Sequence, residues 1–238
     1  MHDHVAELSF FGIGLPQLMA TGDVVSVRFG PGDVIFGDGD DTGRLFLIAA
    51  GRVRIGLHRA DRECLFSVLG RGEIFGEEAV FDPGPTCTCA TAMTEVYAFS
   101  VGRRAIISLL VANPAAAQQI MRAMARRVRR LSGNITDTVY ADVSARVAKQ
   151  LLALAQRFGT QEDGAMRVPM ELTQEQFAQL VGTSRESVNK ALCEFVERGW
   201  ISTHRDAIVI KQSEPLATRM QGARRPGRRS RQPEMAGR

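Results

Sequence analysis

The sequence predicts an α+β chain with an N-terminal antiparallel β-roll of the jelly-roll type, one long helix and a C-terminal winged helix-turn-helix. Three patterns lead to this fold class: glycine-punctuated alternating runs from Val24 to Val101, a narrow apolar stripe with a helical period, and two short helices meeting at Gly182. We place the roll at 1–112, the long helix at 113–141, the winged unit at 142–215 and a basic, disordered tail at 216–238.

Length and charge set the first bounds. At 238 residues the chain is long enough for two domains of ordinary size. Its formal net charge is +4, but the segment from Leu216 onward carries seven Arg against one Glu, so the remainder is near −2. The basic balance therefore reflects the tail and is weak evidence for nucleic acid. No apolar run is long enough to span a membrane and the start lacks a signal-peptide pattern, so we expect a cytoplasmic protein without membrane attachment.

The first 100 residues predict a short helical start followed by strands. Residues 1–22 are expected to form one or two short helices and a loop, and His2 and His4 are interpreted as part of a frayed terminus. Fifteen of the 23 Gly lie at or before Gly102, as expected where many tight turns join short strands.

The four Cys do not predict a disulfide framework, because they are few and scattered in a chain expected to be cytoplasmic. Cys87 and Cys89 are expected on one face of a strand. No second Cys pair or nearby His pair supplies further ligands, so no metal site is predicted.

The long helix predicts a dimer. A first helical piece ends before Asn113, because Pro114 disfavours helix in the residue ahead of it but is accepted in a first turn. The stripe that follows has the narrow width of a coiled-coil seam, formed by Ile120, Met124, Val128, Leu131, Ile135 and Thr138 or Val139. The basic residues on the other faces are interpreted as solvated: Arg122, Arg126, Arg127, Arg129 and Arg130. A hinge is expected at 141–143.

Two capping boxes predict the helix pair. Thr173 with Gln176, and Thr183 with Glu186, have the spacing in which a side-chain oxygen satisfies a free amide of the first turn. Gly182 between them suits a left-handed exit from the first helix. The following segment alternates like a hairpin wing and turns at 204–206. An ordinary amphipathic helix pair is the competing interpretation, but the two boxes, the glycine turn and the wing favour a DNA-reading unit.

These motifs resemble one family, that of the cyclic-AMP receptor protein and the fumarate-nitrate reduction regulator. The segments TSRESVNKAL and RVAKQLLALAQRFGTQEDGAMRV are similar to the actinobacterial cyclic-AMP receptor regulators, and the likeness runs from about Phe29 to Ser213. Pro31-Gly32-Asp33 and Gly51-Arg52-Val53 resemble the cyclic-nucleotide-binding roll. The resemblance implies a homodimeric transcription regulator on a palindromic operator with TGTGA-like half-sites, and RNA polymerase is a further partner that it allows.

The resemblance also implies the DNA contacts. Arg185 would bond a guanine, Glu186 would accept from a cytosine or position Arg185, and Lys190 stands where the founding member has another base-reading Arg. Phosphates would be held by Thr173, Gln174, Ser184 and Ser187, and Asn189 completes the polar face.

Residues 70–92 resemble the phosphate-binding cassette of the nucleotide-binding roll. Gly76 would let the backbone approach a phosphate, a short helix would begin at about Glu77, and Glu77 would accept from a ribose hydroxyl. Besides these two, the candidate ligand-binding residues are Phe75, Glu78, Thr86, Cys87, Leu131 and Ser132.

The cassette departs from its relatives where the phosphate would be paired. Thr86 and Cys87 stand in place of the family's Arg and the Thr or Ser after it, and Leu131 replaces an adenine-contacting Thr, while Ser132 is retained. Cyclic AMP, the one candidate effector, is therefore expected to bind weakly or not at all.

Two alternatives stay open. One is a cyclic-AMP-responsive regulator with intact nucleotide binding. The other is a nonspecific DNA-binding protein driven by the Arg-rich tail, which truncation after Ser213 would separate from a true regulator. A signalling enzyme or channel is not expected, because no catalytic pair, Gly-rich nucleotide loop or membrane segment accompanies the roll. The target genes and the sign of regulation are not readable from the sequence.

Overall fold

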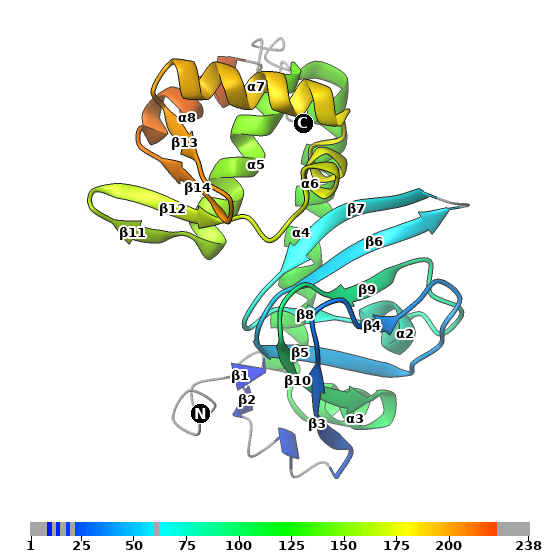
Figure 1. Cartoon of the computed structure of the whole chain (residues 1–238). Helices are drawn as coiled ribbons and strands as arrows, with labels where there is room; N and C mark the ends of the chain where they lie inside the picture. The colour runs from blue at the N-terminus through cyan, green and yellow to red at the C-terminus, as the bar shows by residue number, and fades with distance from the viewer. Residues whose placement is uncertain (1–8, 11–12, 15–17, 20–21, 60–61, 223–238) are drawn as a thin grey trace, which may run out of the picture.

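The computed structural model describes residues 9–10, 13–14, 18–19, 22–59 and 62–222. The roll and the winged helix-turn-helix lie at opposite ends of the molecule, and the long helix α4 passes between them (Figure 1). Within this part of the chain, no helix combines the length and the apolar character that crossing a membrane requires.

The predicted roll is confirmed as two four-stranded antiparallel sheets. One sheet has the order β3 (Val24–Phe29), β10 (Val96–Gly102), β5 (Arg44–Ala50) and β8 (Ile74–Phe75). The other has the order β4 (Val34–Phe36), β9 (Cys89–Ala92), β6 (Val53–Arg59) and β7 (Arg62–Leu69). The strand β8 was not predicted, since two residues are too few to show alternation, whereas β9 begins at Cys89, where a strand was expected.

The prediction of helices in residues 1–22 is wrong for part of that segment. β1 (Ser9–Phe10) and β2 (Ile13–Gly14) pair antiparallel, and only residues 18–19 of the described positions before Gly22 are helical. Periodicity does not distinguish helix from strand in so short an apolar stretch. The histidines at 2 and 4 lie outside the described residues.

Two helices follow the roll, and the break between them lies where the sequence predicts it. α3 (Arg103–Ala112) ends before Asn113, and α4 (Pro114–Tyr140) begins with proline in its first turn. The backbone N–H of Ala116 donates to Asn113 Oδ1 at 3.3 Å, so Asn113 caps the long helix.

The apolar stripe of α4 divides into two parts. Ile120 is 4% exposed and belongs to the core of its own roll, so the predicted seam is wrong at this position, and Met124 packs partly against the same core. Val128 is 61% exposed and Ile135 and Val139 are each 68% exposed. The part of the stripe left for a partner helix therefore begins after Met124, with Met121 also exposed on the preceding turn.

The C-terminal unit opens with α5 (Val143–Phe158), α6 (Gln174–Val181) and α7 (Arg185–Glu197). Its sheet has the order β11 (Thr160–Glu162), β12 (Ala165–Pro169), β14 (Ala207–Ile210) and β13 (Ile201–Thr203). The wing β13–β14 turns at 204–206 as predicted, whereas the β11–β12 hairpin was not predicted.

A final helix, α8 (Ser213–Gly222), extends the fold beyond the predicted end of the winged unit. Leu216 has no exposed surface and joins the hydrophobic core of this unit. The expectation of disorder from 216 is therefore wrong up to residue 222, where Leu216 is buried and Arg219 pairs with Asp142. Residues 223–238 are not described.

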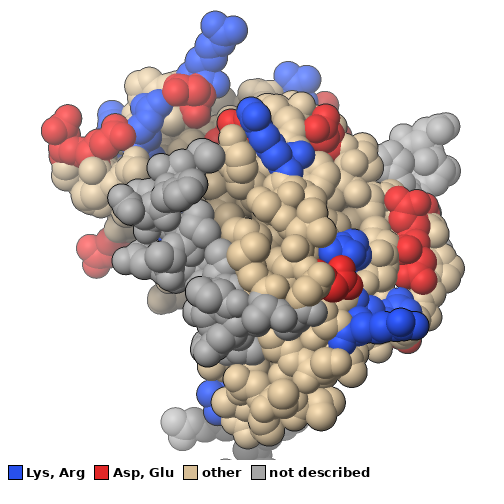
Figure 2. Space-filling view, turned by 90° about the horizontal axis from the view of Figure 1, so that it is seen from below, with Lys and Arg blue, Asp and Glu red and all other residues tan. Residues whose placement is uncertain are grey.

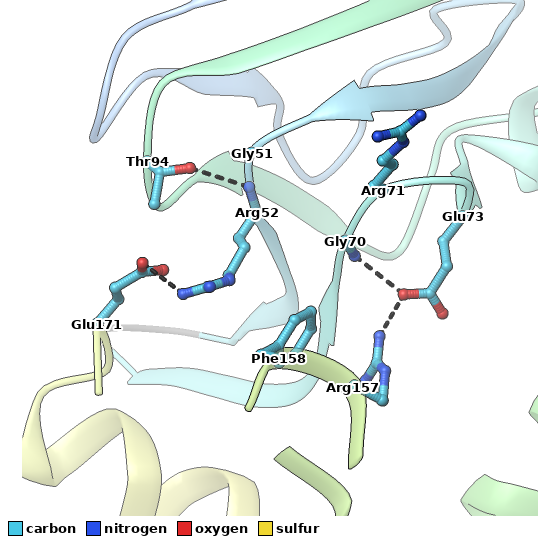
Figure 3. Close-up of a pocket in the computed structure, with 9 residues that line it drawn as sticks. All are labelled: Gly51, Arg52, Gly70, Arg71, Glu73, Thr94, Arg157, Phe158 and Glu171. Atoms are coloured by element: carbon cyan, nitrogen blue, oxygen red, sulfur yellow. Dashed lines mark hydrogen bonds and ion pairs between the residues drawn. The ribbon is translucent and has the colours of Figure 1, made fainter. Parts of the chain in front are cut away.

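The two ends of the molecule share one core. Leu65 and Val68 of β7 pack in the same cluster as Phe177 and Val181 of α6. Beside this cluster the Phe158 ring lies between two guanidinium groups, 4.9 Å from Cζ of Arg52 and 4.7 Å from Cζ of Arg157 (Figure 3).

Ion pairs reinforce this contact. Arg52 pairs with Glu171 and Arg157 with Glu73, so each guanidinium joins the roll to the C-terminal unit (Figure 3). Gly70 leaves room for the Phe158 ring, because a Cβ there would lie 2.6 Å from Cε1 of the ring.

Candidate functional site

The turn between α6 and α7 is built from its predicted residues. The backbone N–H of Gln176 donates to Thr173 Oγ1 at 3.1 Å and that of Thr173 to Gln176 Oε1 at 3.0 Å, which confirms the first capping box. Gly182 leaves α6 with φ +75°. The N–H groups of Gly182 and Thr183 then donate back to α6, a Schellman ending that keeps the turn short.

The second capping box is wrong by one residue. The N-cap of α7 is Ser184, whose Oγ accepts from the backbone N–H of Ser187 at 3.3 Å. Thr183 does not cap α7 because its N–H still donates to Ala178 O of α6 at 3.0 Å. The helix α7 thus begins at Arg185.

The two faces of α7 separate as predicted. Val188, Ala191 and Phe195 are buried against α5 and α6. On the opposite face, Ser187 is half-buried. The other predicted DNA-contacting residues of this face are exposed: Ser184, Arg185, Glu186, Asn189 and Lys190. Thr173 and Gln174 are exposed beside them on the first turn of α6.

Two contacts orient the charged residues at the start of α7. Arg185 Nε donates to Gln174 Oε1 at 2.9 Å, so α6 positions this arginine. The pKa of Glu186 lies below its ordinary value, because its carboxylate accepts from its own backbone N–H and then from the Ser184 hydroxyl, with Arg185 adding a smaller attraction. Glu186 is therefore a carboxylate at neutral pH.

The cassette helix forms where the sequence predicts. α2 (Glu77–Phe81) follows Gly76, whose φ is +82°. A Cβ at Gly76 would lie 2.7 Å from the carbonyl oxygen of Arg44, so both conformation and space require glycine here. Phe75 is 1% exposed and stacks on Phe46 with ring centroids 4.9 Å apart, so its ring belongs to the core.

Glu77 already has a cationic partner. Arg127 of α4 forms an ion pair with it, and the two side chains are only 17% and 15% exposed. The interpretation of Arg127 as part of a solvated face is therefore wrong. The residue predicted to accept from a ribose is tied instead to the long helix.

Thr86 is bound to the loop between β4 and β5. Its side chain is buried, and its hydroxyl donates to the carbonyl of Gly37 at 3.1 Å. Its backbone N–H donates to Asp40 O at 3.1 Å, and its carbonyl accepts from Gly39 N–H at 2.8 Å. Thr86 brings no positive charge to the position where the resemblance implies a phosphate partner.

The remaining cassette residues line an apolar space or face solvent. Glu78 is exposed and accepts from Thr88 Oγ1 at 3.3 Å. Leu131 is half-buried and Ser132 is exposed on α4.

The two neighbouring cysteines do not share a strand face. Cys87 is exposed in a bend before β9, whereas Cys89 is buried as the first residue of β9. Among the described residues, no group of three or more His, Cys, Asp or Glu could hold a metal ion.

Comparison with known proteins gives matches over both ends of the chain. Residues 26–113 match the cyclic nucleotide-binding domain and residues 145–219 the Crp-like helix-turn-helix domain. The chain is 49% identical, over 194 residues, to the CRP-like cAMP-activated global transcriptional regulator of Mycobacterium tuberculosis, covering 81% of this chain and 87% of that one.

Solved structures show the same fold. A CRP-family transcriptional regulator of Thermus thermophilus has a TM-score of 0.69 at 25% identity, covering 82% of this chain and 96% of its own. FixK2 of Bradyrhizobium japonicum has a TM-score of 0.73 at 17% identity, covering the same shares of the two chains.

Proposed function

Since this chain belongs to the family of transcription regulators that includes the cyclic-AMP receptor protein and the fumarate-nitrate reduction regulator, we propose that it binds a palindromic operator as a homodimer. It is a regulator with a cyclic nucleotide-binding domain and a DNA-binding helix-turn-helix, and its relatives are not enzymes. The observation that carries the proposal is the exposed polar face of α7, on which Gln174 fixes Arg185.

The dimer is supported by the exposed apolar residues of α4. Met121, Val128 and Ile135 follow one another at intervals of seven, and Val139 continues the same face. A strict seven-residue repeat is the pattern of two helices packed as a coiled coil. Four large apolar side chains with more than half of their surface exposed are costly unless a second copy covers them.

Two-fold symmetry would set the operator. Each α7 would enter the major groove, with half-sites about 34 Å apart along the duplex. In this arrangement Arg185 reads a guanine, while the exposed hydroxyl of Thr173 and the amide of Gln174 reach phosphates. We expect TGTGA-like half-sites, because TSRESVNKAL is so similar to the family's recognition segment.

We further propose that cyclic AMP binds weakly or not at all. Thr86 is uncharged and its hydroxyl is bonded to Gly37 of the β4–β5 loop, and Leu131 replaces a polar adenine contact. Losing a charge-assisted bond to phosphate costs about 1.5–3 kcal/mol, roughly ten- to 150-fold in affinity. Retention of cyclic-AMP control is the alternative, favoured by the preserved Gly76 turn before α2.

A tail-driven, nonspecific DNA-binding protein is the rival to an operator-binding regulator. The face of the roll in Figure 2 shows the basic and acidic side chains of the described residues in small, mixed groups rather than one basic surface. Truncation after Ser213 does not distinguish these two functions, because it would also remove α8 and the buried Leu216 and so disturb the fold.

The chain should instead end at Gly222, which keeps α8 intact. We expect the shortened and full-length chains to prefer operator over scrambled DNA by the same ratio in fluorescence anisotropy, with a flatter salt dependence for the shortened one. Loss of the preference on truncation would support the tail-driven alternative.

A further inference from the structure

The helix α8 lies against the link between the long helix and the C-terminal unit. α4 ends at Tyr140 and α5 begins at Val143, so only Ala141 and Asp142 separate them, and both have an extended backbone. The contact between β7 and α6 holds the C-terminal unit at one place, and this link holds it at a second. The side chains around the link therefore help to set the angle between α4 and α5.

One carboxylate at the link serves two helices. Asp142 Oδ1 accepts from the backbone N–H of Ala145 at 2.9 Å and so caps α5. The other oxygen, Oδ2, pairs with Nη1 of Arg219 at 3.0 Å. Because Arg219 belongs to α8, this ion pair ties α8 to the start of α5.

α8 is itself fixed in place, as a brace must be. It packs along α5, and Leu216 is fully buried in the core of the C-terminal unit. Arg219 and Met220 follow Leu216 at intervals of three and four, so all three lie on one face of α8. Met220 and Gln221 line a small cavity of about 50 Å³ together with Ala141, so the last turn of α8 reaches the link.

A second ion pair holds the end of α4 on the other side of the link. Lys149 of α5 pairs with Asp137 of α4 and donates to Asn134 Oδ1 at 3.0 Å. Asp137 comes two residues after Ile135, which is about 200° around the helix. The pair therefore lies away from the exposed apolar stripe, and a second copy that covers the stripe would leave this pair in place.

We propose that α8, through the pair of Arg219 with Asp142, fixes the angle at which the C-terminal unit leaves α4, and thereby the half-site separation that the dimer accepts. Both residues are positioning residues, acting on α7 through α5. Their side chains are 35% and 52% exposed, so the pair adds little to stability and acts mainly on geometry. The effect on half-site separation rests on the proposed function, whereas the brace itself does not.

Operator spacing gives a readout that a loss of stability alone would not change. One base pair added between the half-sites moves them about 3.4 Å apart and turns one relative to the other by about 35°. A rigid dimer cannot follow both changes, whereas a looser link lets each α7 adjust. The measure is therefore the ratio of the affinity at the preferred spacing to the affinity one base pair away.

Fluorescence anisotropy measures this ratio on duplexes that carry two TGTGA-like half-sites with spacers varied one base pair at a time. Arg219→Met should lower the ratio by about two- to fivefold, the range that an exposed ion pair can supply. Asp142→Asn keeps an oxygen to cap α5 but removes the charge, so it should give the same change, and the double variant no more. Arg28→Met breaks an exposed pair with Glu95 on the roll and should leave the ratio unchanged.

Hydrogen exchange examines the brace without DNA. The backbone N–H of Ala141 donates to Asp137 O at 2.9 Å, and it should exchange about two- to fivefold faster in Arg219→Met, because the link is less restrained. The N–H of Phe177, which donates to Thr173 O at 2.9 Å in α6, should exchange at an unchanged rate.

Each result decides one claim. Unchanged exchange at Ala141 in both Arg219→Met and Asp142→Asn would overturn the brace. Faster exchange with an equal loss of affinity at every spacing would overturn the positioning role. Faster exchange in the variants, with no preference of the wild type for these half-sites over scrambled DNA at any spacing, would uphold the brace and overturn the proposed function.

Discussion

The guanidinium group of Arg127, on the long helix, pairs with the carboxylate of Glu77, the first residue of α2. Fifty residues separate the two in the sequence. The pair connects the cassette directly to α4. Any ligand that bonds to Glu77 must therefore also contact Arg127 or displace it from Glu77. It also adds a contact by which the roll positions α4.

Breaking this pair should destabilise the fold. Arg127→Met leaves a largely buried carboxylate without a partner and should lower the free energy of unfolding by roughly 3 kcal/mol, measured in urea. Arg126→Met, on the exposed neighbour, should stay within about 0.5 kcal/mol. Adding Glu77→Gln to Arg127→Met should recover part of the loss, and a purely additive double variant would mean that the two groups do not interact.

The contacts that the sequence predicts are local ones. Thr173 and Gln176 are three residues apart, so their capping box follows from helix geometry alone. The pair of Glu77 with Arg127 depends on how α4 crosses the roll, which no local pattern contains. Ile120 shows the same limit, because an apolar stripe has the same period whether it packs on its own roll or on a second chain.

Specific DNA recognition should depend on both Arg185 and Gln174. Arg185→Ala should cost about 1–3 kcal/mol on operator and relax the preference at one base pair per half-site. Gln174→Ala should weaken that same base preference when Arg185 is present, because the Gln174 side-chain oxygen holds the guanidinium of Arg185. In a protein that already carries Arg185→Ala, Gln174→Ala should not change the base preference further.

Thr173→Ala is the comparison, expected to weaken operator and random DNA alike. Binding to randomised half-sites measures all three effects. If Arg185→Ala lowers affinity for operator and random DNA equally, the base-reading role of Arg185 is wrong.

The exposed stripe of α4 predicts the dimer interface. Val128→Glu would bury unpaired charge on both chains and should give monomers with poor operator affinity, as seen by light scattering and anisotropy. Gln119→Glu adds the same charge at an exposed position nine residues earlier, which is about two and a half turns and therefore on the opposite side of the helix, and should leave the dimer intact. A full dimer in Val128→Glu would place the interface elsewhere.

Restoring a cation to the cassette should restore nucleotide binding. Thr86→Arg should raise affinity for cyclic AMP by about 1.5–3 kcal/mol, since it adds a charge-assisted bond to the phosphate. Thr86→Met removes the same hydroxyl bond to Gly37 without adding charge and should show no gain. Leu131→Thr should add a smaller increment, as one neutral hydrogen bond would. No difference between Thr86→Arg and Thr86→Met would remove Thr86 from the explanation.

Calorimetry of the wild-type protein with cyclic AMP, paired with operator binding in the presence and absence of the nucleotide, tests the account most directly. A cassette without a phosphate partner predicts a dissociation constant in the high micromolar range or no detectable heat. Operator affinity should then be the same with and without the nucleotide. Tight binding of cyclic AMP, with operator affinity rising on its addition, would contradict the account and show that another residue supplies the missing charge.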